Sequence, residues 1–264
     1  MKKLAEFILN FVAKILSLNS DVLYYLITKP LKTEAESMLK RFNAYDHIDR
    51  AMLIAGKKYD AHSNFIIVDV GGGIGTTAEM FSKQFKIPVY IFEPIKSNIE
   101  ILQNKSKAYP QWKIFHKALG SFSQESVINI TKNMPSSSLL EVFSNDTDTE
   151  ISKDDLFSTI FKEKIVISTL DEEISTIDKK ILILKIDVQG YELEVLKGSI
   201  NSLNHISIIV LEMSNHNDYV GAPKYFELDD ILRRNNFKLF DFYPSIRDST
   251  GIKEWDSIYI NNQH

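Results

Sequence analysis

The sequence of 264 residues contains no cysteine. Disulfides, thiolate metal sites and a cysteine nucleophile are therefore excluded, and the composition fits a reducing compartment such as the cytoplasm. No apolar run reaches the roughly 18 residues that a helix needs to span a bilayer. The formal net charge of −4 argues against a broad nucleic-acid-binding face, so no nucleic-acid partner is expected.

An amphipathic segment opens the chain. Its apolar residues recur at three- and four-residue steps, and they are Leu4, Phe7, Ile8, Phe11, Val12, Ile15 and Leu16. It has neither the uninterrupted apolar core nor the small-residue cleavage site of a signal peptide. Two interpretations stay open. The segment is either a helix packed on the main domain or a second subunit, or a helix lying on the inner membrane surface or a membrane-bound partner.

A second helical segment begins at Thr33–Glu36, which resembles a capping start, and is expected to stop at Gly56. We therefore expect a helical extension over residues 1–60 and the main domain over residues 61–264.

The most informative stretch is a buried strand followed by closely spaced glycines. Residues 65–70 are apolar apart from Asp69, and Gly71, Gly73 and Gly75 then lead into a helix. Glycine has no Cβ, so the backbone can turn sharply and a ligand can lie against it. The spacing differs from the Gly-x-Gly-x-x-Gly of dinucleotide sites, and the turn has no lysine for binding phosphate.

Further buried strands alternate with amphipathic helices. Strands are expected at 89–93, 112–118, 164–170, 181–187 and 206–212, with 126–131 as an edge strand and 237–242 and 257–260 as a closing antiparallel pair. This alternation predicts a layered α/β protein with a mostly parallel sheet. The polar segment 135–157 is either a loop over a pocket or a solvated insertion.

Ligands of such sheets bind at the carboxyl ends of the strands. Four acids stand at or near these ends, namely Asp69, Glu93, Asp187 and Glu212. Lys185 lies within an apolar strand and needs a partner if it is buried.

Glu93 lies 18 positions after Gly75, where an acid of a βαβ unit can accept hydrogen bonds from ribose hydroxyls. The expected ligand is therefore a nucleoside. Asp69 beside the turn would repel a pyrophosphate and favour a cationic ligand. A nucleoside that carries positive charge instead of phosphate indicates S-adenosylmethionine.

Several blocks resemble the FkbM family of class I methyltransferases. They are Asp-Val-Gly-Gly-Gly-Ile-Gly from Asp69, Phe-Glu-Pro from Phe92, and Lys-Ile-Asp-Val-Gln-Gly-Tyr-Glu-Leu-Glu-Val-Leu-Lys-Gly from Lys185. The segments Thr169-Leu-Asp and Ile209-Val-Leu-Glu also match, in the order of the family. The first block has two glycines where the family often has Ala-Asn, and the segment before residue 65 is not part of the common domain.

The resemblance implies a Rossmann-like class I methyltransferase fold, with a mostly parallel seven-stranded sheet and helices on both faces. It also implies S-adenosylmethionine-dependent O-methylation of a hydroxyl on a sugar, glycan or natural product, so the expected partner is a small-molecule or glycan acceptor.

The resemblance further implies roles for the cofactor site. Gly71, Gly73 and Gly75 would make room for the methionine part and the ribose, and Asp69 would lie near the amino end of the cofactor. Glu93 would hold the ribose hydroxyls. The adenine would be bordered by Ala118 and Leu119.

An alcohol must lose its proton during methylation, and a carboxylate or histidine at the strand ends could accept it. Asp187 is the first candidate, although it could instead position the cofactor or the backbone. Glu212 and His216 follow. Asp187 and Glu212 could alternatively share a divalent cation such as magnesium. Two acids are too few to support a metal site, so no metal ligand is assigned.

Two other functions compete with the methyltransferase. A nicotinamide-dependent oxidoreductase would use Glu93 for its ribose, although the glycine spacing counts against it. A non-catalytic scaffold would use the N-terminal segment to hold a membrane-bound glycan assembly complex.

Overall fold

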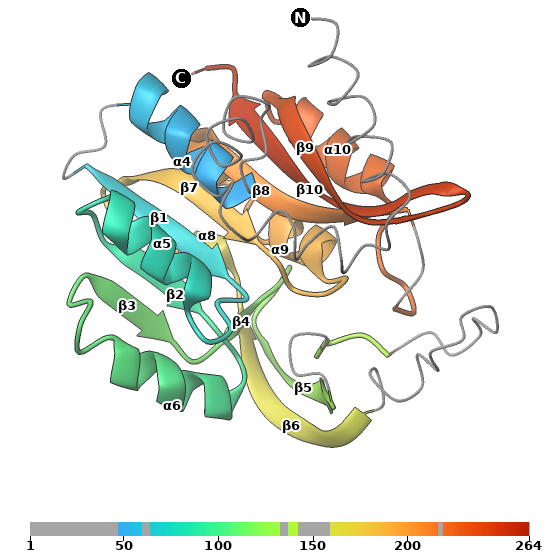
Figure 1. Cartoon of the computed structure of the whole chain (residues 1–264). Coiled ribbons are helices and arrows are strands. Elements are labelled where there is room, and N and C mark those ends of the chain that lie inside the picture. Colours follow the sequence, from blue (N-terminus) through green and yellow to red (C-terminus); the bar gives the residue numbers. More distant parts are fainter. Residues whose placement is uncertain (1–46, 60–63, 133–136, 142–158, 216–218, 264) are drawn as a thin grey trace, which may run out of the picture. The chain divides into compact units, whose positions relative to one another are not determined.

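The computed structural model describes residues 47–59, 64–132, 137–141, 159–215 and 219–263, all within one compact unit. The amphipathic segment before His47, most of segment 135–157 and His216 lie outside the described residues. Figure 1 shows a large twisted sheet with helices on both faces and a smaller sheet beside it. No helix in these ranges is long and apolar enough to cross a membrane.

The main sheet has seven strands in the order β3-β2-β1-β7-β8-β10-β9. Their bounds are β1 Phe65–Val70, β2 Val89–Phe92, β3 Trp112–Phe115, β7 Lys180–Ile186, β8 Ile206–Ser214, β9 Phe237–Asp248 and β10 Gly251–Asn261. The five strands from β3 to β8 are parallel, and β10 runs antiparallel to both of its neighbours. The predicted mostly parallel sheet and the closing antiparallel pair are confirmed.

Helices cover both faces of this sheet because successive strand residues point to opposite sides. One core joins Ile67 of β1 to the helices α4 (His47–Lys58), α5 (Thr76–Gln84) and α6 (Lys96–Lys105). The other joins Ile66 and Val68 to α8 (Leu170–Ile174), α9 (Glu192–Lys197) and α10 (Tyr225–Arg234). Strand β1 is buried throughout, which explains its continuous run of apolar residues.

A small second sheet has the order β4-β6-β5, with bounds β4 Ala118–Leu119, β5 Gln124–Thr131 and β6 Thr159–Ser168. Its inner face packs Ala118, Ile128, Ile130, Ile165 and Ile167 against Ile95. The expected edge strand at 126–131 is therefore an edge, but of this second sheet, and it forms one wall beside the carboxyl end of β2.

Three expected boundaries are wrong. Helix α4 continues through Gly56 to Lys58, so Gly56 does not end the helix. A Cβ at this position would meet nothing within 4 Å. The single strand expected at 112–118 is two strands, because β3 pairs with β2 whereas β4 pairs with β6. The strand expected at 164–170 begins at Thr159 and ends at Ser168, because Thr169 caps the start of α8.

Candidate active site at the carboxyl ends of the strands

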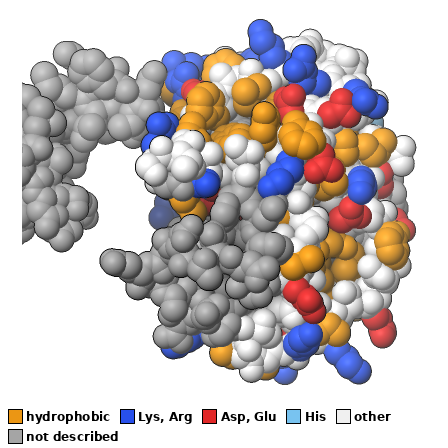
Figure 2. Space-filling view, turned by 90° about the vertical axis from the view of Figure 1, so that its right-hand side faces the viewer, with side chains coloured by type: hydrophobic (Ala, Val, Ile, Leu, Met, Phe, Trp, Pro, Cys, Tyr) orange, Lys and Arg blue, Asp and Glu red, His pale blue; other side chains and the backbone are white. Residues whose placement is uncertain are grey.

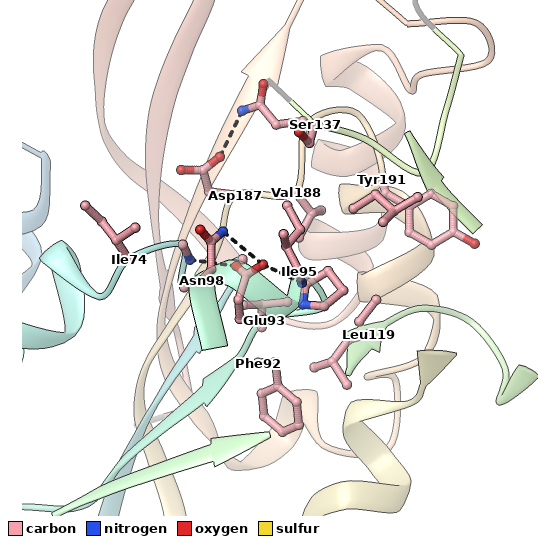
Figure 3. Close-up of a pocket in the computed structure, with 18 of the residues that line it drawn as sticks. Ile74, Phe92, Glu93, Ile95, Asn98, Leu119, Ser137, Asp187, Val188 and Tyr191 are labelled. Carbon is pink, nitrogen blue, oxygen red and sulfur yellow. Dashed lines mark hydrogen bonds between the residues drawn. The ribbon is translucent and has the colours of Figure 1, made fainter. Parts of the chain in front are cut away.

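A cavity of about 480 Å³ lies at the carboxyl ends of β1, β2 and β7. The glycine turn, the start of α6, strand β4 and the loop after β7 surround it, with Ile128 of the second sheet on one side. Figure 3 shows Glu93 and Asp187 facing the same space, with Leu119 and Tyr191 on its far side. Six predicted site residues line the cavity, namely Gly71, Gly73, Glu93, Ala118, Leu119 and Asp187.

The glycines of the turn have different roles. A Cβ on Gly71 would lie 1.9 Å from the carbonyl oxygen of Asp187, so this glycine allows β1 to turn directly against the end of β7. Gly73 has a φ of +52°, and a Cβ there would meet nothing within 4 Å. Gly73 therefore borders open space in the cavity, where a ligand can approach the backbone. Gly75 does not line the cavity and instead packs against Leu102 and Trp112.

Glu93 follows β2 and is held by three donors. Its Oε2 accepts a hydrogen bond from the backbone N–H of Gly73 at 2.7 Å, which ties the glycine turn to the end of β2. Its Oε1 accepts from the backbone N–H of Ile95 at 2.8 Å and from Asn98 Nδ2 at 3.3 Å. Burial raises the pKa of Glu93 to about 7, although these hydrogen bonds oppose the rise. Glu93 is thus fixed in place and titrates near neutral pH.

Lys185 is a buried cation between two carboxylates. The register of β1 and β7 pairs Lys185 with Asp69, and its Nζ lies 3.4 Å from Asp69 Oδ1 and 3.2 Å from Asp187 Oδ2. Nζ also donates to the carbonyl oxygen of Gly71 at 3.2 Å. Burial alone would lower the pKa of Lys185, but the two carboxylates outweigh burial and raise it above its ordinary value. The partner that the sequence required for Lys185 is therefore present.

The two carboxylates beside Lys185 differ in environment. Asp69 is fully buried beneath the turn and does not line the cavity, so this geometry offers it no direct contact with a ligand there. Burial raises the pKa of Asp69, against the attraction of Lys185. The side chain of Asp187 is 44% exposed. Its surroundings would raise its pKa by desolvation, but Lys185 outweighs that effect and lowers it, so Asp187 is ionised at neutral pH.

Gln189 is a central residue of the site that the sequence reasoning missed. Its Nε2 donates to Asp187 Oδ1 at 3.0 Å and to Glu212 Oε2 at 3.3 Å. Its Oε1 accepts from the hydroxyl of Tyr219 at 3.1 Å, which fixes the orientation of the amide. Gln189 has a φ of +55°, a region that non-glycine residues seldom adopt. Its position within the long matched block was the available signal.

Hydrogen bonds with Glu192 and Ser138 hold the loop that carries Asp187 and Gln189. Glu192 Oε1 accepts from the backbone N–H groups of Val188 at 3.3 Å and Gly190 at 3.0 Å. Ser138 Oγ donates to the carbonyl oxygen of Gln189 at 2.6 Å. Burial raises the pKa of Glu192 to about 7. A buried acid thus supports the loop from the helix that follows it.

Glu212 differs from Asp187 although both were candidate bases. It does not line the main cavity but borders a small cavity of about 30 Å³ together with Glu192. Burial raises the pKa of Glu212 to about 10, and the charge of Asp187 adds to the rise. Glu212 therefore holds a proton at neutral pH, which makes it a poor base there.

The amide of Gln189 bears on the alternative in which Asp187 and Glu212 share a divalent cation. The amide of Gln189 donates to both Asp187 and Glu212, so these two acids are joined by a hydrogen-bond donor. Among the residues that the structure describes, no group of three or more His, Cys, Asp or Glu side chains could hold a metal ion.

Comparison with known proteins gives one family match. The model of the methyltransferase FkbM domain matches residues 69–239, which include the glycine turn, Glu93, Asp187 and Glu212. No curated protein matches the sequence.

Several solved structures are similar to this chain at low sequence identity. Methyltransferase FkbM from Methylobacillus flagellatus KT is 16% identical with a TM-score of 0.44, and the match covers 75% of this chain and 43% of that one. This chain therefore spans less than half the length of that protein. An rRNA methylase from Streptococcus thermophilus is 9% identical with a TM-score of 0.44, and the match covers 83% of this chain and 98% of that one. Magnesium protoporphyrin IX methyltransferase from Synechocystis PCC 6803, solved with bound SAM, is 9% identical with a TM-score of 0.44, at coverages of 81% and 78%.

Proposed function

The chain belongs to the FkbM family of methyltransferases, and from the site described above we propose that it transfers a methyl group from S-adenosylmethionine to a hydroxyl of a sugar, glycan or natural product. The observation that carries this proposal is the meeting of Gly73, Glu93 and Asp187 around one cavity. A backbone surface, a ribose acceptor and a proton acceptor are the three parts that such a reaction needs from the protein.

The residues of the cavity fit the proposed cofactor. Its volume of about 480 Å³ lies in the range of small-molecule sites. Gly73 borders open space, so the methionine part has room against the backbone. Glu93 would accept the ribose hydroxyls through the lone pairs that its three donors leave available. The apolar side chains of Ile95 and Leu119 line the cavity and would border the adenine.

When bound, S-adenosylmethionine supplies a methyl group on a sulfonium sulfur that a nucleophile can displace. In the proposed reaction the acceptor oxygen forms the new bond to carbon, and the electrons of the broken C–S bond remain on sulfur. The protein would mainly hold the two reactants in line, because positioning can supply much of the rate of such a displacement.

Asp187 is the proposed base. It is ionised, faces the cavity, and is held by Lys185 on Oδ2 and by Gln189 on Oδ1. The proton of the acceptor hydroxyl would pass to this carboxylate as the oxygen attacks, because the hydroxyl becomes a strong acid only as the new bond forms. A positioned base typically contributes about 10²–10⁴-fold in rate.

Calorimetry with S-adenosylmethionine and its demethylated product tests the cofactor part. We expect both to bind the full chain, and Glu93→Ala to weaken binding at least tenfold, or about 1.4 kcal/mol. Absence of binding by either compound would overturn the proposal, and tight binding of a reduced nicotinamide cofactor would favour the oxidoreductase instead.

Transfer of labelled methyl from S-adenosylmethionine to a panel of sugars, glycans and hydroxylated natural products tests the acceptor part. Asp187→Asn keeps the shape of the side chain but removes the base. We expect it to bind the cofactor normally and to lose about 10²-fold or more in transfer. A variant that keeps full transfer would rule out Asp187 as the base, and a scaffold role predicts that Asp187→Ala leaves cell function intact.

We further propose that the protein works in the cytoplasm, with its N-terminal segment either packed against protein or lying on the inner membrane surface. The amphipathic pattern of residues 4–16 supports both placements. Deletion of residues 1–30 followed by cell fractionation separates them. A shift of the shortened chain from membrane to soluble fractions supports the membrane placement, and an unchanged distribution removes it.

A further inference from the structure

A second hollow lies between α10 and the two closing strands β9 and β10. Its volume is about 880 Å³, and none of its lining residues borders the cavity that holds Glu93 and Asp187. It is lined by Met213, Asn215, Tyr225, Asp229, Arg233, Phe237, Lys238, Leu239, Phe242, Ile252, Trp255, Ser257, Tyr259 and Asn262. We call these residues the α10 groove.

Three aromatic rings along the α10 groove are exposed or only partly buried, namely those of Tyr225, Phe242 and Trp255. The rings of Tyr225 and Trp255 lie 5.4 Å apart at an angle of 56°. Tyr225 is 40% exposed and Phe242 is 48% exposed. Figure 2, which faces the side of the β9–β10 hairpin, shows hydrophobic side chains interspersed with acidic and basic ones. Exposed aromatic rings that line a concave surface indicate a ligand-binding site.

Polar groups stand between these rings. Asp229 accepts a hydrogen bond from the hydroxyl of Tyr259 at 2.8 Å, which fixes its carboxylate at the groove. Arg233 lies one turn further along α10, 3.5 Å from the same carboxylate.

We infer that the α10 groove binds a saccharide chain. A sugar ring offers apolar C–H faces that can lie on Trp255 and Tyr225, and hydroxyls around its rim that can bond to Asp229 and Arg233. A purely apolar ligand would leave Asp229 and Arg233 desolvated without new partners, at a cost. A polyphosphate would meet the carboxylate of Asp229, and of the two cations that line the groove Arg233 is already paired with that carboxylate, which leaves Lys238. The mixture of flat rings and paired polar groups therefore selects a polyhydroxylated ligand.

The α10 groove and the side chain of Glu212 lie on opposite faces of strand β8. Trp255 is the register partner of Met213 on β8, and the next pair along is Asp256 with Glu212. Because side chains alternate along a strand, Met213 faces the groove while Glu212 points to the other face. Glu212 is joined through Gln189 to Asp187. The α10 groove is therefore a site separate from the cavity that holds Asp187, and saccharide binding there does not depend on the proposed methyltransferase function.

The test is saturation-transfer NMR and calorimetry on the full chain with three probes, namely chitotriose, cellotriose and trigalacturonate. At least one should bind, with a Kd on the order of 1 mM or tighter. Trp255→Ala and, separately, the more exposed Tyr225→Ala should each weaken that binding at least tenfold. Phe226→Ala is the matched control, because Phe226 is 57% exposed beside Tyr225 but does not line the groove.

Two outcomes would overturn the inference. One is absence of binding by all three saccharides while an apolar dye binds the groove, which would make it a plain hydrophobic surface. The other is saccharide binding that survives both groove variants, which would place the site elsewhere. S-adenosylmethionine affinity measured on the same variants should not change, so a failure of the groove is distinguishable from a failure of the proposed cofactor site.

Discussion

The ammonium group of Lys185 lies 3.2 Å from the carboxylate of Asp187, and the lysine side chain is only 8% exposed. This ion pair connects the buried side of the sheet to the cavity, because the same ammonium lies 3.4 Å from the fully buried Asp69. One cation thus keeps one acid stable in the core and the other ionised at the surface of the site.

Replacing Lys185 with methionine tests this arrangement. The change leaves Asp69 buried without a counter-charge, so we expect a loss of about 3–5 kcal/mol in the free energy of unfolding, measured with urea. The double variant Lys185→Met with Asp69→Asn should recover much of this loss. Lys197→Ala is the control, because Lys197 forms an exposed pair with Glu194 at 2.7 Å and should cost less than about 1 kcal/mol. Equal costs for the two lysines would contradict the buried-pair assignment.

The glycine turn allows a test that separates folding from ligand binding. Gly73→Ala places a methyl group in the open space of the cavity, so it should weaken S-adenosylmethionine binding while costing roughly 1–2 kcal/mol in stability for its positive φ. Gly71→Ala should cost about 3 kcal/mol or more, since its Cβ would meet the backbone of Asp187.

Gly221→Ala is the control for the backbone strain that Gly73→Ala introduces. Gly221 has a φ of +79° and open space around its Cβ position, but it lies outside the cavity. It should match Gly73→Ala in thermal stability and retain normal cofactor affinity. A loss of affinity in Gly221→Ala would mean that strain, not occupied space, explains the effect at Gly73.

Buried Glu192 predicts a pH dependence of stability. Its pKa rises from 4.5 in the unfolded chain to about 7 in the folded protein. A raised acid pKa means that the folded state binds the proton more tightly, so the contribution of Glu192 to stability is highest below pH 4.5 and falls as the pH rises to about 7. The fall for this residue is up to about 3 kcal/mol, at 1.36 kcal/mol per unit.

Glu192→Gln keeps an oxygen acceptor for the two backbone N–H groups and removes the charge. Urea unfolding at pH 5, 7 and 8.5 should show a smaller loss of stability with rising pH in this variant than in the parent. Glu172→Gln, at an acid that is largely exposed to solvent, should leave the slope unchanged. Parallel curves for parent and Glu192→Gln would show that Glu192 is ionised in the folded protein at little cost.

Much of the main sheet was predictable because a local pattern of apolar residues marks each of its strands. The apolar run of β1 and the acids that end β2, β7 and β8 can be read locally, and the rule that ligands bind at strand ends brought Glu93 and Asp187 together. The small second sheet was not predictable, since β5 and β6 pair across a long polar segment and nothing local specifies that pairing.

The contacts of the site were less predictable than its location. The sequence required a partner for Lys185 but could not say that one lysine would serve both Asp69 and Asp187, because that depends on the register of β1 and β7. The ranking of Glu212 as a base also depended on its surroundings. Its high pKa comes from burial beside other acids, which the position at a strand end does not reveal.

Gln189 yields the sharpest test of the catalytic half of the site. Gln189→Gly removes the amide that holds Asp187. Glycine readily adopts the backbone φ of +55° found at this position, so the loop should keep its shape. With an acceptor identified from the methyl-transfer panel, we expect cofactor affinity within about twofold of the parent and transfer reduced roughly 10²-fold, because a misplaced base costs about that much. The donor from Gln189 helps to lower the pKa of Asp187, so its loss should move the acid limb of the pH–rate profile to higher pH. Tyr219→Phe, which removes the hydroxyl that orients the amide, should shift the profile in the same direction by less. A rate loss with an unmoved pH profile would mean that Gln189 supports the loop but does not tune the base.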